Sequence, residues 1–158
     1  MNKQKVYIET SVISYLTSRP SRDIIVSSHQ QITNQWWKKS KSKFNNYISE
    51  FVIDEISKGD KSASEIRLAS VKNIQLLEYD DDIVEIAINY ANLLSIPEKA
   101  RLDAFHLAIS VYYEIDFLLS WNCKHIANAV VMSKLRDYNK TKNLFTPILC
   151  TPLELLEV

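Results

Sequence analysis

Short apolar runs alternate along the chain with longer segments whose apolar positions recur at helical spacing. The apolar runs are rich in β-branched and aromatic residues, which predicts strands at residues 5–9, 46–49, 74–78, 116–120 and 148–150. Helical spacing predicts helices from about 12 to 18, 23–43, 50–56, 61–71, 83–94 and about 97–114, with a final turn at 151–154. Strands that alternate with helices indicate an α/β fold: a parallel sheet covered by helices on both faces, as in a three-layer α/β/α sandwich.

Residues that favour helix ends support these boundaries. Thr10 and Ser11 are expected to cap the first helix, and Gly59 follows the predicted end of the helix over 50–56. Ser95-Ile96-Pro97-Glu98 and Thr151-Pro152-Leu153-Glu154 both have the spacing of a capping box. The apolar positions expected on the helix over 23–43 are Ile24, Ile25, Ile32, Trp36 and Trp37.

Composition narrows the class of protein. A chain of 158 residues with 46% apolar and 24% charged residues is expected to form one domain over residues 1–158. Its 19 basic and 19 acidic residues give a net charge of zero, so any nucleic-acid contact must use a local patch. Gly59 is the only glycine, which argues against the glycine-rich loops of P-loop and dinucleotide-binding proteins.

Cysteine content and hydropathy indicate a cytoplasmic protein. Cys123 and Cys150 make neither a disulfide framework nor a zinc site. No apolar stretch approaches the roughly 20 residues of a membrane span, and the N-terminus lacks the layout of a secretory signal. We therefore expect no membrane association.

Four polar residues stand where a parallel sheet would bring them together. Glu9 ends the first strand, Asn122 follows the fourth, and Glu55 and Asp103 lie on predicted helices. Ligands of α/β sheets bind beyond the carboxyl ends of the strands, and carboxylates gathered there bind hard divalent cations such as Mg²⁺ or Mn²⁺. The four positions therefore predict a metal site at this edge of the sheet.

Asp103 is the most informative of the four. The predicted helix places it about one and a half turns from the start, within an otherwise apolar run. Aspartate is a poor residue for a helix interior, and burying its charge without a partner is costly. A metal ion would supply that partner. His106, three residues further on, could orient the carboxylate.

Each of these residues also has an ordinary structural explanation. A carboxylate at a strand end or helix boundary is commonly just solvated, and asparagine after a strand commonly forms a turn. His106 and His125 could be structural hydrogen-bonding residues, and the aspartates at 80–82 are better explained as helix caps than as a metal cluster. The adjacent tryptophans at 36 and 37 fit the core or an interface better than base stacking.

Taken in order, the four positions resemble those of PIN-domain nucleases, and among them the VapC-type toxins of toxin–antitoxin pairs. The similarity spans essentially the whole chain. The motifs that carry it are Val6-Tyr7-Ile8-Glu9-Thr10-Ser11-Val12, Tyr47-Ile48-Ser49 leading to Glu55, Asp103-Ala104-Phe105-His106-Leu107-Ala108, and Leu118-Leu119-Ser120-Trp121-Asn122. No single motif is specific, whereas the ordered set at whole-domain length is fairly specific.

The resemblance implies a PIN-like, Rossmann-like sheet of four or five parallel strands and metal-dependent cleavage of RNA. Glu9, Glu55 and Asp103 would hold Mg²⁺ or Mn²⁺, and Asn122, with Ser120 and Thr10, would position water or ligands. It also implies homodimers and a small antitoxin protein that covers the active groove.

Two positions depart from the family pattern. Glu9 stands where the family usually has aspartate, and Asn122 stands where many members have a second aspartate. Fewer charged ligands weaken cation affinity, so a one-metal site or a weak enzyme is expected. An alternative is a catalytically weak binding module that acts through an antitoxin or a DNA-binding partner. A metal-dependent phosphatase ranks below both, because no nucleophilic aspartate motif is evident.

Overall fold

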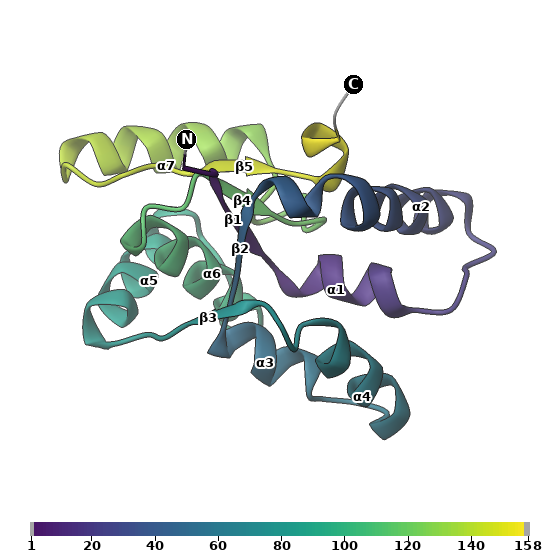
Figure 1. Cartoon of the computed structure of the whole chain (residues 1–158). Coiled ribbons are helices and arrows are strands. Elements are labelled where there is room, and N and C mark those ends of the chain that lie inside the picture. Colours follow the sequence, from purple (N-terminus) through teal and green to yellow (C-terminus); the bar gives the residue numbers. More distant parts are fainter. Residues whose placement is uncertain (1, 157–158) are drawn as a thin grey trace.

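The computed structural model describes residues 2–156, and its centre is a five-stranded sheet in which every paired strand runs parallel (Figure 1). The strand order is β3-β2-β1-β4-β5. The strands are β1 (Lys5–Ile8), β2 (Asn45–Ser49), β3 (Gln75–Leu77), β4 (Phe117–Leu119) and β5 (Ile148–Cys150). The predicted α/β fold with a parallel sheet between helices is confirmed.

Seven α-helices within the described residues flank this sheet. They are α1 (Thr10–Thr17), α2 (Ile24–Lys39), α3 (Glu50–Ile56), α4 (Lys61–Ser70), α5 (Asp81–Leu93), α6 (Arg101–Tyr112) and α7 (Ala129–Thr141). Three short 3-10 turns are η1 (Lys41–Lys43), η2 (Glu98–Ala100) and η3 (Pro152–Leu155). No helix in the described part of the chain is long and apolar enough to cross a membrane.

Helix α7 is the element that the sequence analysis missed, since nothing was predicted between residues 121 and 147. A local signal for it existed. The side chain of Asn128 caps the helix by accepting hydrogen bonds from the backbone N–H groups of Val130 and Val131. Val131 and Leu135 are buried at helical spacing behind it.

The core lies along the two central strands. Val6, Tyr7 and Ile8 of β1 and Leu118 and Leu119 of β4 are all fully buried. Helices on both faces of a parallel sheet explain why these strands read as continuous apolar runs. Burying each large apolar side chain contributes roughly 1.5–3 kcal/mol, so the centre of the sheet dominates the hydrophobic stabilisation.

The predicted apolar face of α2 is only partly correct. Trp36 is fully buried, as expected for a core tryptophan, but Ile24 and Ile25 are 86% and 67% exposed. These two isoleucines occupy the first turn of α2, which begins after the N-cap Asp23 at the end farthest from the sheet (Figure 1). Helical spacing alone does not show where a helix leaves the core.

Two predicted helix starts were wrong. Glu9, rather than Thr10 or Ser11, caps α1, because its side chain accepts a hydrogen bond from the backbone N–H of Ser11. Ser95 does not open a helix with a capping box. It has a φ of 53° and ends α5, with the N–H of Ile96 donating to the carbonyl of Ala91. Such a left-handed residue closes a helix, so α6 begins only at Arg101.

Other predicted end signals are confirmed. Asp80 caps α5 by accepting from the backbone N–H groups of Asp82 and Ile83. Thr151 and Glu154 form the capping box of η3. Gly59 has a φ of 86° in the turn between α3 and α4, a conformation that glycine adopts without steric cost.

A buried hydrogen bond joins α5 to α7, and its loss has a predictable cost. The Tyr90 hydroxyl donates to Asn139 Oδ1 at 2.6 Å, while the Asn139 amide donates to the carbonyl of Phe145 and the hydroxyl of Thr146. Tyr90→Phe leaves the buried Asn139 oxygen without its donor. We expect a loss of about 1–3 kcal/mol in the free energy of unfolding, measured by urea denaturation. Tyr79→Phe, at a half-exposed tyrosine, should stay within about 0.5 kcal/mol of wild type. Equal losses in the two variants would contradict this assignment.

Candidate metal centre

The carboxyl ends of neighbouring parallel strands bring the candidate residues to one edge of the sheet. Glu9 directly follows β1, and its backbone N–H donates to the carbonyl of Leu119 at the end of β4. Helix α3 begins directly after β2 and carries Glu55, while α6 carries Asp103 and His106. Three crossovers therefore converge on the same edge, as expected for a parallel sheet.

Glu9 is a buried carboxylate, with 4% of its surface exposed. Its Oε2 accepts from the backbone N–H and the hydroxyl of Ser11 and from the Ser120 hydroxyl, the last at 2.7 Å. Burial raises the pKa of Glu9, and the hydrogen bonds from the two serines and the nearby charge of His106 act against that rise. All three donors reach Oε2, so within residues 2–156 Oε1 is left without a donor.

Glu55 is held from two sides. Its Oε1 accepts from the Thr10 hydroxyl at 2.7 Å and lies 2.6 Å from His106 Nε2. Burial acts to raise the pKa of Glu55, but the hydrogen bond and charge of His106, with Thr10 and Lys58, hold it below its ordinary value. The pKa values of Glu55 and Glu9 are therefore shifted in opposite directions.

The imidazole of His106 is fully buried and is held at both nitrogens. Nδ1 lies 2.6 Å from the Tyr7 hydroxyl, which lies 2.6 Å from the Ser49 hydroxyl. Burial acts to lower the pKa of His106, but the Glu55 contact and the charges of Glu9, Glu55 and Asp103 together raise it. The spacing of residues 103 and 106 predicted that His106 would orient Asp103. The structure instead directs its ring to Glu55, because α3 packs against α6.

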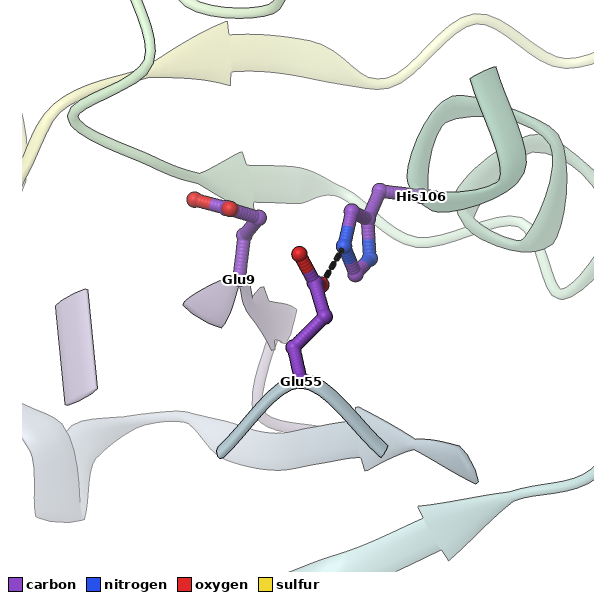
Figure 2. Close-up of side chains that lie close together, drawn as sticks. All are labelled: Glu9, Glu55 and His106. Carbon is purple, nitrogen blue, oxygen red and sulfur yellow. Dashed lines mark hydrogen bonds and ion pairs between the residues drawn. The ribbon is translucent and has the colours of Figure 1, made fainter. Parts of the chain in front are cut away.

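Glu9, Glu55 and His106 form the one group of potential metal ligands found among the described residues. Each offers one ligand atom, and these atoms all lie within 4.8 Å of one another. Figure 2 shows the three side chains approaching from the start of α1, from α3 and from α6. Two carboxylates and one imidazole suit a divalent cation, so the cluster could hold a metal ion.

Asp103 lies outside this group of three. Its Oδ2 is 2.7 Å from His125 Nδ1, and both side chains are largely buried. Since α6 begins at Arg101, Asp103 lies in the first turn rather than in the helix interior. The helix dipole favours an acidic residue there, which removes the argument that a metal must compensate the position. Asp103 still acts on His106 through its charge.

Asn122 organises the loop after β4. Its Oδ1 accepts from the backbone N–H groups of Lys124 and His125, and its carbonyl accepts from Ile126 and Ala127. This is the turn chemistry that the sequence left open as an alternative. The loop in turn presents His125 to Asp103. The Ser120 hydroxyl donates a hydrogen bond to Glu9 of the cluster, and the Thr10 hydroxyl donates one to Glu55.

An open cavity of about 520 Å³ adjoins the cluster. Four carboxylates line it, those of Asp54, Glu55, Glu98 and Asp103, together with three cationic side chains: Lys58, Lys99 and Arg101. These three cations were not predicted from the sequence. They come from separate segments, the turn after α3 and the approach to α6, so no local pattern marks them. Tyr7 was not assigned to the site for the same reason, whereas His125 was interpreted as a structural hydrogen-bonding residue.

A scan against models of protein families finds no match, and a search of curated proteins finds none either. Solved structures do match. The VapC20 toxin of Mycobacterium tuberculosis, which cleaves the sarcin–ricin loop, aligns with a TM-score of 0.59 and 16% identity over 75% of this chain and 91% of the toxin. This chain has the PIN-like fold of VapC toxins.

Two further matches support the same fold. A toxin–antitoxin complex from Klebsiella pneumoniae aligns with a TM-score of 0.54 and 15% identity, covering 75% of this chain and 88% of that one. VapBC2 of Rickettsia felis, bound to a DNA fragment from its promoter, aligns with a TM-score of 0.54 and 11% identity over 94% and 98%. At such identities the likeness shows the fold.

The raised pKa of His106 predicts a pH-dependent stability. Between its ordinary value of 6.5 and the raised folded value, the native state binds more protons than the unfolded chain. The free energy of unfolding should therefore fall as pH rises through this window. Denaturant titrations of metal-free protein across it test the slope. Glu55→Gln removes one of the charges that raise the pKa and should flatten the slope. An unchanged slope in that variant would show that another group causes it.

Proposed function

We propose that this protein is a metal-dependent endoribonuclease that cleaves RNA phosphodiester bonds and acts as the toxin of a toxin–antitoxin pair, with residues 1–158 as a single PIN-like domain. The convergence of Glu9, Glu55 and His106 at the carboxyl edge of the sheet carries this proposal. The match to a toxin that cleaves the sarcin–ricin loop supports it, because the fold is the same.

In this proposal Glu9 and Glu55 bind Mg²⁺ or Mn²⁺, and Asp103 completes the oxygen ligands from the side of the cavity. The bound ion would activate water for attack and stabilise charge that develops on the phosphate. Ser11 and Ser120 orient Glu9 through Oε2, and Thr10 orients Glu55. Asn122 contributes by holding the loop that carries His125, the partner of Asp103.

The cations beside the cluster support an RNA substrate. Lys58, Lys99 and Arg101 line the same cavity as Glu55 and Asp103. Asp54 and Glu98 line the same cavity, and Arg101 lies 3.2 Å from Glu98, so the lining is not a net basic patch. The three cations instead offer individual phosphate contacts, which supply much of the affinity for nucleic acid. We assign these three residues to the phosphates that flank the cleaved bond.

Asp103→Asn and Glu9→Gln should each lower metal-dependent RNA cleavage by roughly 100-fold or more, because a charged ligand is replaced by a neutral one of similar shape. The measurement is cleavage of a structured RNA by purified protein with Mn²⁺ or Mg²⁺, beside growth after expression in bacteria. Asp137→Asn, at an exposed position of α7, removes the same charge away from the cluster and serves as the control. Full cleavage by folded Asp103→Asn, with a contaminating nuclease ruled out, would overturn the proposal.

Replacing Lys99 or Arg101 by glutamine should raise KM for RNA about three- to tenfold with little change in kcat, because a phosphate contact is lost away from the reacting atoms. The loss should shrink as salt concentration rises. Lys72→Gln, at an exposed lysine outside the cavity, is the matched control. A fall in kcat at constant KM would contradict a role in phosphate binding.

We also propose an antitoxin protein as partner and a homodimer as the assembly. The Klebsiella match is a toxin–antitoxin complex, which supports an antitoxin for this chain. Co-expression with the product of the neighbouring reading frame, followed by size-exclusion chromatography with light scattering, measures both. A protein that elutes as a monomer and does not bind the co-expressed product would contradict this part of the proposal.

One observation favours the alternative of a catalytically weak binding module. Asn122 is neutral, and the loop backbone already uses its side-chain oxygen. The cluster then lacks a carboxylate after β4, which weakens cation binding. Tight binding to the antitoxin without any metal-dependent cleavage would favour this alternative.

A further inference from the structure

We propose that His106 is itself a metal ligand, through Nε2, and that this nitrogen makes the centre select a first-row transition ion such as Mn²⁺ over Mg²⁺. The inference deepens the proposed function and rests on the metal centre that it contains. It concerns the identity of the ion, which the carboxylates alone leave open.

The burial of His106 supports a fixed ligand. Its ring is fully buried on α6, and Nε2 points at the Glu55 carboxylate (Figure 2). Nε2 lies 2.6 Å from Glu55 Oε1, and His106 belongs with Glu55 and Glu9 to the group whose ligand atoms, one from each residue, all fall within 4.8 Å. A buried imidazole held at this place needs no rotation of its ring to meet an ion shared by the two glutamates.

The other ring nitrogen has the partner that a metal-binding histidine requires. Such histidines usually donate their second ring N–H to a fixed acceptor, which sets the tautomer and the ring orientation. Here Nδ1–H can donate to the Tyr7 hydroxyl oxygen, and the Tyr7 hydroxyl can donate to Ser49 Oγ. Tyr7 belongs to β1 and Ser49 ends β2, so the sheet itself orients the ring. With Nδ1–H directed at Tyr7, an ion that binds Nε2 would displace the proton that this nitrogen shares with Glu55 Oε1, and that proton would be released to solvent.

The ligand set then decides which ion is favoured. Mg²⁺ prefers oxygen ligands and keeps several waters, so an imidazole adds little to its binding. First-row transition ions accept imidazole readily, and their affinity rises from Mn²⁺ towards the later metals. Glu9 and Glu55 serve either kind of ion, whereas His106 strengthens only the second. The chain's own nitrogen therefore sets the selectivity.

Metal binding without RNA tests the selectivity. Metal-free full-length protein is titrated with Mn²⁺ or Mg²⁺ alone in a calorimeter. We expect Mn²⁺ to bind at least about tenfold more tightly than Mg²⁺ in wild type, and His106→Gln to remove most of that ratio by weakening Mn²⁺. Equal affinities in wild type, or equal weakening of both ions in the variant, would overturn the inference. Circular dichroism establishes that each variant is folded.

Pulsed electron paramagnetic resonance on the Mn²⁺ complex tests the ligand directly. We expect the ¹⁴N coupling of a coordinated imidazole in wild type, and its absence with bound Mn²⁺ overturns the inference even where the buried substitution fails to fold. The chain has three histidines, so the nitrogen can be assigned. The coupling should persist in His29→Gln and His125→Gln. It should also persist in Tyr7→Phe, with a smaller loss of Mn²⁺ affinity than in His106→Gln.

The outcomes are separable from those of the proposed function. A protein that binds Mn²⁺ through nitrogen but leaves RNA intact would keep this inference and remove the nuclease. A protein that cleaves RNA with an all-oxygen site would do the reverse. Failure to bind either ion would remove this inference.

Discussion

The contact between Glu55 and His106 is the interaction on which the arrangement of the site depends. It joins residues 51 positions apart and ties α3, which follows β2, to α6, which precedes β4. Glu55 is also hydrogen-bonded to Thr10 of α1, and His106 to Tyr7 of β1. One short hydrogen bond, with its immediate neighbours, thus links four elements at the carboxyl edge of the sheet.

Burying this cluster costs folding free energy. Glu9, Glu55 and His106 lie where the apolar interior of the sheet begins, and removing ionisable groups from water costs several kcal/mol each unless they are paired. Short hydrogen bonds offset that cost: serine and threonine hydroxyls donate to the carboxylates, and a tyrosine hydroxyl is the partner of the imidazole. The two glutamates respond differently, since burial raises the pKa of Glu9, whereas at Glu55 the contacts of His106, Thr10 and Lys58 together outweigh burial and lower the pKa. Closely placed groups with opposed pKa shifts are typical of functional sites.

Much of the fold could be predicted because the strands are buried on both faces and read as apolar runs. All five strands were found, and the helices that pack an apolar stripe on the sheet were found with them. Helix α7 was missed although Asn128 caps it, because its buried stripe is narrow. The start of α6 was misplaced because Ser95, in a left-handed conformation, closes α5 instead of opening a helix. That error put Asp103 in a helix interior and suggested a stronger argument for a metal than the structure supports.

The sequence by itself determined the alternation of strands and helices, and with it the edge of the sheet where Glu9, Glu55, Asp103 and Asn122 would gather. Residue spacing carries that information, because parallel strands end on the same side. Only the tertiary structure decided the partners: His106 with Glu55, His125 with Asp103, and the loop backbone with the Asn122 oxygen. These pairings depend on how α3, α6 and the loop after β4 approach one another. Packing across the sheet sets that approach, and no local spacing encodes it.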